Sequence, residues 1–259
     1  SLIPSHESGV ALLGGAVYGT PGAVHVLAPY VGASRLASGI RTHTTTDHRS
    51  LIIAGGITLA APAETAVDIA RGRHPAIGLA VGDAMLRLDD TTSREHLQLL
   101  NASRATKRGR EIARWALARV NSDAETAVES VSRAVIEWLG FPAPELQRSF
   151  VAETGEVDRS DYVWEAASLA GEADGDLKFD GRFGDAGALL RQQRARDARL
   201  RQHLRMVAHW GWHDATTFTP LATLLRGAGL VSFAPGNIAA LTPLRHLLST
   251  RPPHPTAQH

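Results

Sequence analysis

Residues 160–178 read SDYVWEAASLAGEADGDLK, and this stretch decides the predicted fold. Its first half, residues 160–167, is rich in the aromatic and β-branched side chains that favour strands. Residues 169–179 then predict another strand that runs into a turn at an Asp-Gly pair. The stretch therefore predicts two neighbouring strands, and acidic residues lie on both.

The segments on either side complete a mixed helix and strand unit. Working outward, the pattern predicts a helix, three strands, a helix, a strand and a final helix, over residues 124–140, 146–152, 160–167, 169–179, 186–204, 205–210 and 216–230. Gly140 and Pro142 are suited to stopping the first of these helices. The fold class expected is α+β, with an α-βββ-α-β core in this half of the chain.

The length of 259 residues predicts two compact units. Residues 1–120 combine short strands, glycine and proline turns and several helices, which indicates a small N-terminal α+β domain. The polar residues 121–123 form the expected joint and helix cap, so the second domain is predicted over residues 121–248. Residues 249–259 have the composition of a loose tail.

The acidic residues of the two central strands have the spacing of a metal site. Side chains alternate along a strand, so Glu172 and Asp174 are expected on one face, and Asp161 reaches them if the strands pair as a hairpin. Glu129, in the preceding helix, offers a further oxygen if that helix packs across the sheet. Lys178 is a candidate for orienting the attacking water or balancing charge on a phosphate. Carboxylates arranged in this way hold Mg²⁺, with Mn²⁺ as the alternative, in enzymes that cleave phosphodiesters.

The same blocks resemble a known family. The strings ESVSRAVIEWLGFPAPELQ, SDYVW, EADGDLKF, RQQRARDARLR and MVAHWGW, which start at Glu129, are similar to the nuclease-like domains related to the very-short-patch repair endonuclease. The resemblance covers about the last 110 residues and implies a restriction-endonuclease-like PD-(D/E)XK core. It implies that Asp161 and Glu172 bind metal, that Asp174 and Glu129 support the site, and that Gln147 belongs to the same cleft.

The sequence departs from the usual motif at Asp174 and at the pair Gln193-Arg194. Asp174 stands where the E-x-K half of the motif usually has lysine, and this branch of the family shares the aspartate. Gln193-Arg194 replaces a Glu-Lys pair that is common in relatives. These departures leave open whether the site is active or has lost its activity.

The long helix over residues 186–204 is strongly basic. It is expected to hold a nucleic-acid backbone, and the arginines assigned to that contact are Arg191, Arg194, Arg196 and Arg199. A solvated helix face is the alternative interpretation.

The N-terminal half resembles the region found in AbiEi-type antitoxin-like regulators. The strings SHESGVALLGG, AVHVLAP and APAETAVDIAR carry this resemblance, although the first arginine of the last motif is missing. It implies a non-catalytic regulator that binds DNA or a toxin-like partner protein.

Composition excludes several other classes of function. The chain has no cysteine, which excludes disulfides, zinc-thiolate sites and thiol nucleophiles. A net charge of +1 indicates no global attraction to nucleic acid. No apolar run reaches the length of a membrane span and no signal pattern opens the chain, so a cytoplasmic protein without a membrane partner is expected.

Two histidines, His209 and His213, flank Trp210 and Trp212 near the end of the last predicted strand. For both of them aromatic packing is the favoured interpretation.

Taken together, the sequence predicts a Mg²⁺-dependent hydrolase of DNA phosphodiester bonds. The alternatives are the regulator just described and a protein with a decayed nuclease site. All three are open at the level of sequence.

Overall fold

The chain folds into two compact units, and each of them contains both helices and strands. The computed structural model describes residues 2–19, 22–28, 32–174 and 186–248. Unit 1 comprises the described residues up to Ala127, and unit 2 comprises those from Val128 onward. The α+β class expected from the sequence is confirmed. The units divide after Ala127 rather than after residue 120.

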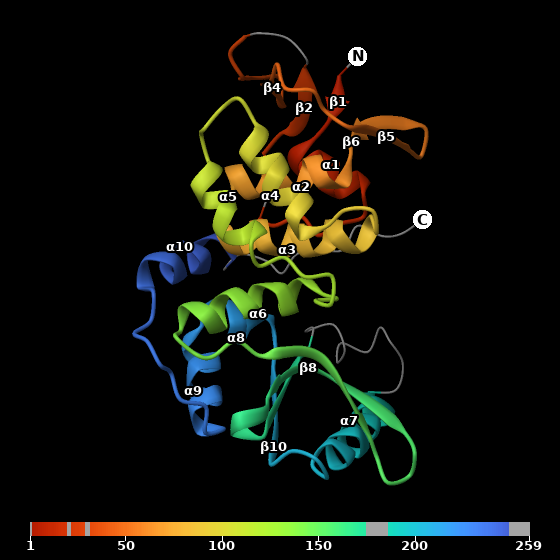
Figure 1. Ribbon diagram of the computed structural model, residues 1–259, viewed down its shortest axis with the longest axis vertical. Coiled ribbons are helices and arrows are strands. Elements are labelled where there is room, and N and C mark those ends of the chain that lie inside the picture. The colour runs from red at the N-terminus through yellow and green to blue at the C-terminus, as the bar shows by residue number, and fades with distance from the viewer. Residues whose placement is uncertain (1, 20–21, 29–31, 175–185, 249–259) are drawn as a thin grey trace. The chain divides into compact units, whose positions relative to one another are not determined.

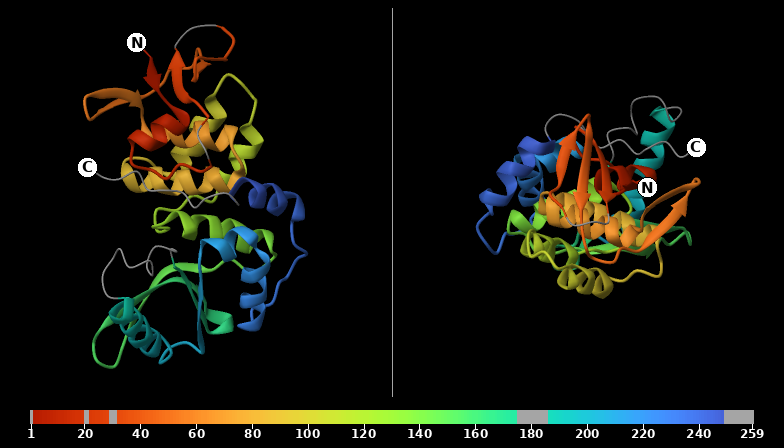
Figure 2. Two further views of the ribbon diagram at one scale, coloured as in Figure 1. Left: turned by 180° about the vertical axis from the view of Figure 1, so that it is seen from behind. Right: turned by 90° about the horizontal axis from the view of Figure 1, so that it is seen from above.

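Unit 1 begins with short strands and continues with helices (Figure 1). The strands are β1 (Ile3–Pro4), β2 (Val24–Ala28), β3 (Arg35–Ala37), β4 (Ile40–Thr44), β5 (Leu51–Ala54) and β6 (Ile57–Ala60). The helices are α1 (His6–Leu12), α2 (Pro62–Gly72), α3 (Pro75–Leu88), α4 (Arg94–Ser103) and α5 (Arg110–Leu117). Four strands form a sheet in the order β1-β2-β4-β3, in which β2 and β4 are parallel. The β5–β6 hairpin forms a separate two-stranded ribbon (Figure 2).

Helix α2 is the centre of unit 1. A proline at its first turn matches the preference for proline at helix starts, and every residue from Pro62 to Ala70 is buried. The neighbouring helix α3 approaches it closely at Gly78, where an added Cβ would lie 2.9 Å from the Cα of Ala70. A side chain at this position would separate the two helices.

Unit 2 contains the α-βββ-α-β order expected from the sequence. Its elements are α6 (Ala127–Trp138), β7 (Glu145–Val151), β8 (Val157–Trp164), η1 (Glu165–Ala167), β9 (Leu169–Ala173), α7 (Ala186–Leu200), β10 (Met206–Trp210), α8 (Trp212–Thr217), α9 (Thr219–Gly227) and α10 (Ile238–Leu248). The four strands form one sheet in the order β10-β9-β8-β7, antiparallel except for the parallel pair β9 and β10.

The two faces of this sheet carry different helices (Figure 1). Tyr162 and Trp210 stack with ring centroids 5.2 Å apart, and the indole of Trp210 donates to Ser132 of α6 at 2.8 Å. The next residue along β8, Val163, projects to the opposite face. There it packs with Leu200 of α7 in an apolar cluster that also contains Phe150, Ala170, Leu204 and Val207.

Three helix predictions differ from the structure. Helix α6 begins at Ala127, so residues 121–123 are not its cap. The segment expected as one final helix is divided at Phe218, whose φ of 53° is left-handed, into α8 and α9. Helix α10 was not predicted from the sequence, and it contains Pro243, a residue that normally breaks helices.

Candidate functional site

Asp161 and Glu172 lie on the adjacent strands β8 and β9. These strands pair with Tyr162 opposite Gly171, and the same antiparallel register continued by one residue sets Asp161 opposite Glu172. Residues opposite each other on neighbouring strands project from the same face of a sheet. Asp161 Oδ2 accepts a hydrogen bond from the backbone N–H of Ala173 at 2.9 Å, which holds its carboxylate against β9.

Glu172 is a buried carboxyl group, with only 2% of its surface exposed. Burial raises its pKa, and the negative charge of Asp161 raises it further, while Arg196 and Ser160 oppose the shift. The result is a pKa of about 7. Its Oε1 atom has no hydrogen-bond partner among the described residues, whereas Oε2 lies 2.8 Å from the guanidinium of Arg196.

Gln147 of β7 links two of the predicted carboxylates, Glu129 of α6 and Asp161 of β8. Its Nε2 donates to Glu129 Oε2 at 2.9 Å and more weakly to Asp161 Oδ1 at 3.4 Å. The hydroxyl of Tyr162 also donates to the main-chain oxygen of Glu129, at 2.7 Å, which fixes the start of α6 against β8. Gln147 has a φ of 52° in the middle of β7, a conformation that costs a non-glycine residue about 1 to 3 kcal/mol. The fold thus holds Gln147 in a strained position between Glu129 and Asp161.

Asp174 forms a second cluster with a histidine that the sequence reading assigned to aromatic packing. Its Oδ2 lies 2.7 Å from Nδ1 of His209 and accepts from Gln193 at 3.2 Å. The other ring nitrogen of His209 lies 3.1 Å from both carboxylate oxygens of Asp197. His209 pairs with Glu172 in the parallel register of β9 and β10, so the two clusters are adjacent.

The two carboxylates control the charge of His209. Burial alone would lower the pKa of this imidazole, but the hydrogen bond to Asp174 and the negative charges of Asp197 and Asp174 outweigh burial and raise it. The interpretation of His209 as a packing residue is therefore incomplete. Two features of the sequence could have indicated a polar role for His209: it is the one ionisable residue of the otherwise apolar strand MVAHW, and Asp197 lies in the preceding helix.

The four arginines assigned to nucleic-acid contact separate into two pairs. Arg191 and Arg194 are exposed on α7. Arg196 contacts Glu172 and the main-chain oxygen of Arg159, and Arg199 binds the Asp158 carboxylate through two nitrogens, at 2.6 and 2.8 Å. Arg196 and Arg199 therefore contact acidic groups of the sheet. Lys178 lies outside the described residues.

Within the described ranges, no group of three or more His, Asp or Glu side chains is arranged to enclose a metal ion. Asp161 and Glu172 form a pair of carboxylates, and Gln147 links Glu129 to Asp161. None of the helices in the described part of the chain is both long and apolar enough to span a membrane.

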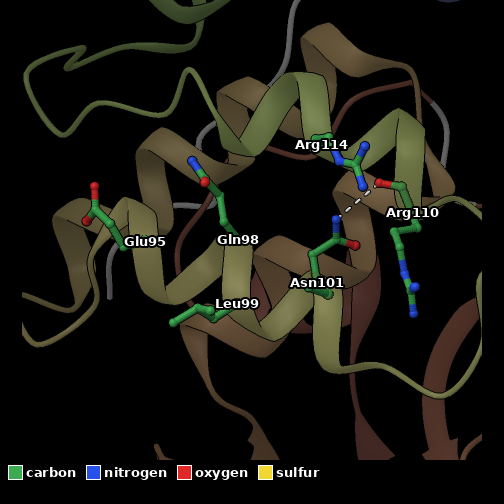
Figure 3. A pocket seen from close by; sticks show the side chains of 7 residues that line it. Glu95, Gln98, Leu99, Asn101, Arg110 and Arg114 are labelled. Carbon is green, nitrogen blue, oxygen red and sulfur yellow. Dashed lines mark hydrogen bonds between the residues drawn. The ribbon is translucent and has the colours of Figure 1, made fainter.

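A surface hollow of about 450 Å³ lies between α4 and α5 of unit 1 (Figure 3). Asn101 donates to the main-chain oxygen of Arg110 at 3.1 Å across it, and Leu99 and Glu95 of α4 also line it. Asn101 also accepts from Arg71. These contacts join α2, α4 and the start of α5, so Asn101 has a structural role at this hollow.

Comparison with known proteins finds similarity to two uncharacterized proteins from two strains of Mycobacterium tuberculosis. Each is 35% identical to this chain over 150 residues, which is 58% of this chain and 54% of the relative. The chain thus spans about half the length of the curated relatives it matches. No family model matches the chain. No solved structure matches it either.

Proposed function

We propose that unit 2 hydrolyses phosphodiester bonds of DNA with the help of a divalent cation. The observation that supports this most directly is the pairing of Asp161 and Glu172 on adjacent strands, with Gln147 linking Asp161 to Glu129 of α6. Two further features support it: the α-βββ-α-β order, and the parallel pairing of β9 with β10. Such an activity belongs in the cytoplasm, where DNA is accessible.

The oxygen donors of this site fit Mg²⁺, or Mn²⁺ in its place. Mg²⁺ binds through one or two carboxylates and completes its shell with water and substrate phosphate oxygens. Asp161 and Glu172 provide two carboxylates, and Glu172 Oε1 is a buried oxygen without a hydrogen-bond partner in the described structure. These two residues would hold the cation, and Glu129 would support Asp161 through Gln147. When bound, the cation would supply Lewis-acid activation of the phosphate and of water.

The remaining polar residues would position the substrate and balance its charge. In most PD-(D/E)XK nucleases a lysine stands two positions after the acidic residue of the third strand, whereas Asp174 occupies that position here, as an aspartate does in the branch of the family that the sequence resembles. Asp174 instead holds His209, whose raised pKa favours a cationic imidazole next to Glu172. His209 would therefore supply the positive charge that the missing lysine provides elsewhere. Exposed Arg191 and Arg194 would contact the DNA backbone.

A second candidate function is that of a non-catalytic regulator that binds DNA or a toxin-like partner protein. The ion pair between Arg196 and Glu172 favours it, because a guanidinium at 2.8 Å competes with a cation for the same carboxylate. In a regulator this pair would be permanent. In a nuclease Arg196 would exchange Glu172 for a substrate phosphate.

Incubating the pure protein with plasmid DNA and Mg²⁺ or Mn²⁺ tests the proposal. Asp161→Asn and Glu172→Gln are expected to lower the cleavage rate by roughly a hundredfold or more, the loss typical of a removed electrostatic contribution to the transition state. The matched control is Glu165→Gln, which changes an acidic residue whose side chain is 80% exposed and pairs with Arg148. This control is expected to cleave like the wild type.

Cleavage that persists in Asp161→Asn would remove this site from the reaction. DNA binding without cleavage, in the wild type and in both site variants, would favour the regulator. Circular dichroism of each variant would establish that the fold is intact.

A further inference from the structure

Unit 1 contains a cavity of about 730 Å³ that is separate from the carboxylate site of unit 2. Its lining combines residues from α1, β2, β4, α2 and the segment after α4. A volume of this size matches ligands of a few hundred daltons rather than a single ion. His6, Glu7 and His25 belong to this lining. They come from the strings SHESG and AVHVLAP, which in the sequence carried only a family resemblance.

Three histidine rings form one part of the lining. The rings of His6 and His43 stack with centroids 3.6 Å apart, and His25 Nδ1 lies 3.0 Å from His43 Nε2. Burial lowers the pKa of all three histidines, that of His43 to about 3. At neutral pH the group is therefore uncharged, and it presents a planar aromatic surface with polar edges.

Cationic side chains outnumber anionic ones among the described residues of the lining. The arginines are Arg41, Arg49, Arg71, Arg73, Arg104 and Arg108, and the carboxylates are Glu7, Asp47 and Asp68. Some of these charges are already paired: Arg49 binds Asp68 at 2.9 Å, and Arg73 contacts Glu7. Even with Glu64, which pairs with Arg49 and Arg104 but does not line the cavity, an excess of positive charge remains.

Three of these arginines, Arg41, Arg71 and Arg108, form no ion pair with a carboxylate of the described residues. Arg71 donates to neutral acceptors, namely Asn101 and the main-chain oxygens of Thr106 and Arg108. Arg41 and Arg108 are exposed, and no carboxylate partner for either is found in the described residues. Deeper in the wall, Arg104 is only 4% exposed, and its Nε has no hydrogen-bond partner in the described part of the chain.

We propose that this cavity binds a phosphorylated small molecule of nucleotide size, with its phosphate held by the arginines and its planar ring against the stacked histidines. Guanidinium groups bind phosphate through paired, charge-assisted hydrogen bonds. The cavity is much larger than a phosphate ion requires, and the neutral imidazoles offer surface for the rest of the ligand. The ligand is therefore an organic phosphate rather than inorganic phosphate.

Isothermal titration of the full chain with adenosine monophosphate, adenosine and inorganic phosphate tests this proposal. Adenosine monophosphate is expected to bind saturably with one site per chain, and at least tenfold more tightly than either adenosine or inorganic phosphate. The double variant Arg41→Gln with Arg108→Gln changes two exposed residues, so its fold is expected to be retained. It should bind adenosine monophosphate roughly tenfold more weakly or worse, as expected when a charge-assisted hydrogen bond is lost.

Lys107→Gln is the matched control, because Lys107 is exposed, adjacent to Arg108 and absent from the cavity lining. Its affinity is expected to stay within twofold of the wild type. Three results would overturn the proposal: no binding of adenosine monophosphate at millimolar concentration, equal affinity for inorganic phosphate, or equal weakening by Lys107→Gln and by the double variant. Binding of oligonucleotides without binding of the mononucleotide would also overturn it, and would indicate a nucleic-acid surface instead.

Discussion

Arg196 and Arg199 of α7 show how neighbouring residues decide what a charged side chain does. The two are three residues apart and so lie on one side of the helix. Arg199 binds Asp158 with two nitrogens, and Arg196 binds Glu172, so both face the sheet. The spacing of arginines in the sequence identified a basic helix, but the acidic partners that decide its inward face come from β8 and β9.

The Arg199 and Asp158 pair predicts a pH-dependent contribution to stability. Hydrogen bonds from Arg199 lower the pKa of Asp158, although its burial acts in the opposite direction. A lowered carboxyl pKa adds stability above the unfolded-state value, and this stability is lost as the pH falls through the folded-state pKa. Asp158→Asn is therefore expected to lower the free energy of unfolding at pH 7 by about 1 to 3 kcal/mol, and the loss should shrink as the pH falls below roughly 4.

Urea unfolding of the wild type and the variant across this pH range measures the effect. Glu156→Gln is the matched control, because Glu156 contacts the same arginine at 3.5 Å but is 58% exposed. Exposed ion pairs contribute little, so the control should change stability by less than about 0.5 kcal/mol. A loss in Asp158→Asn that is equally large at pH 3 and pH 7 would contradict the assignment to the ion pair.

At the scale of elements, the packing of α2 on α3 depends on one small residue. A Cβ at Gly78 would lie 2.9 Å from Ala70 Cα, 3.2 Å from Ala70 Cβ and 3.3 Å from Ala116 Cβ. The first of these is a backbone atom, which cannot move without shifting α2. Gly78 thus allows α2, α3 and α5 to meet, since Ala116 belongs to α5.

Gly78→Ala is expected to destabilise the protein in spite of the better helix propensity of alanine. Propensity favours the change by about 1 kcal/mol, but overpacking a tight contact costs about 1 to 3 kcal/mol. Because the Cα of Ala70 cannot yield without moving α2, we expect the cost to exceed the gain and leave a net loss of up to about 2 kcal/mol, measured by thermal or urea unfolding. Gly72→Ala at the end of α2 is the control, because an added Cβ there meets nothing within 4 Å. A stability gain in Gly78→Ala would show that the helices separate freely.

On the scale of the whole molecule, the near-zero net charge conceals local differences. The chain carries 27 Lys and Arg against 26 Asp and Glu, yet arginines dominate the cavity of unit 1 and carboxylates gather on β8 and β9 of unit 2. The net charge of a protein governs its nonspecific attraction to charged molecules, whereas binding at a site depends on the charged side chains that line that site. The two candidate sites therefore suit ligands of different charge.

The division into two units predicts that local destabilisation stays local. Hydrogen exchange of the Gly78→Ala variant should show faster exchange in α2, α3 and α5, while β8, β9 and β10 keep the protection of the wild type. Mass spectrometry of peptides from both units measures this directly. An equal loss of protection in both units would mean that they open as a single cooperative structure.

Much of unit 2 was predictable because its elements follow local rules. Alternating and aromatic-rich segments marked the strands β7, β8, β9 and β10, and the two positions Asp161 and Glu172 followed from where those strands lie. Helix α10 was missed because Pro243 is a helix breaker by propensity, and packing of Leu241 and Leu244 in the core outweighs that preference.

The sequence by itself determined the α+β class, the order of the elements in unit 2 and the strands that carry its acidic residues. Those features depend on the pattern of apolar and polar side chains over a few consecutive residues, and this pattern can be recognised in one amino-acid sequence. Tertiary structure alone decided that His209 lies between Asp174 and Asp197, that Arg196 contacts Glu172, and that residues of α1, β2, β4 and α2 line one cavity. Such contacts join positions tens of residues apart, and their geometry depends on how helices and sheets pack, which no local spacing specifies.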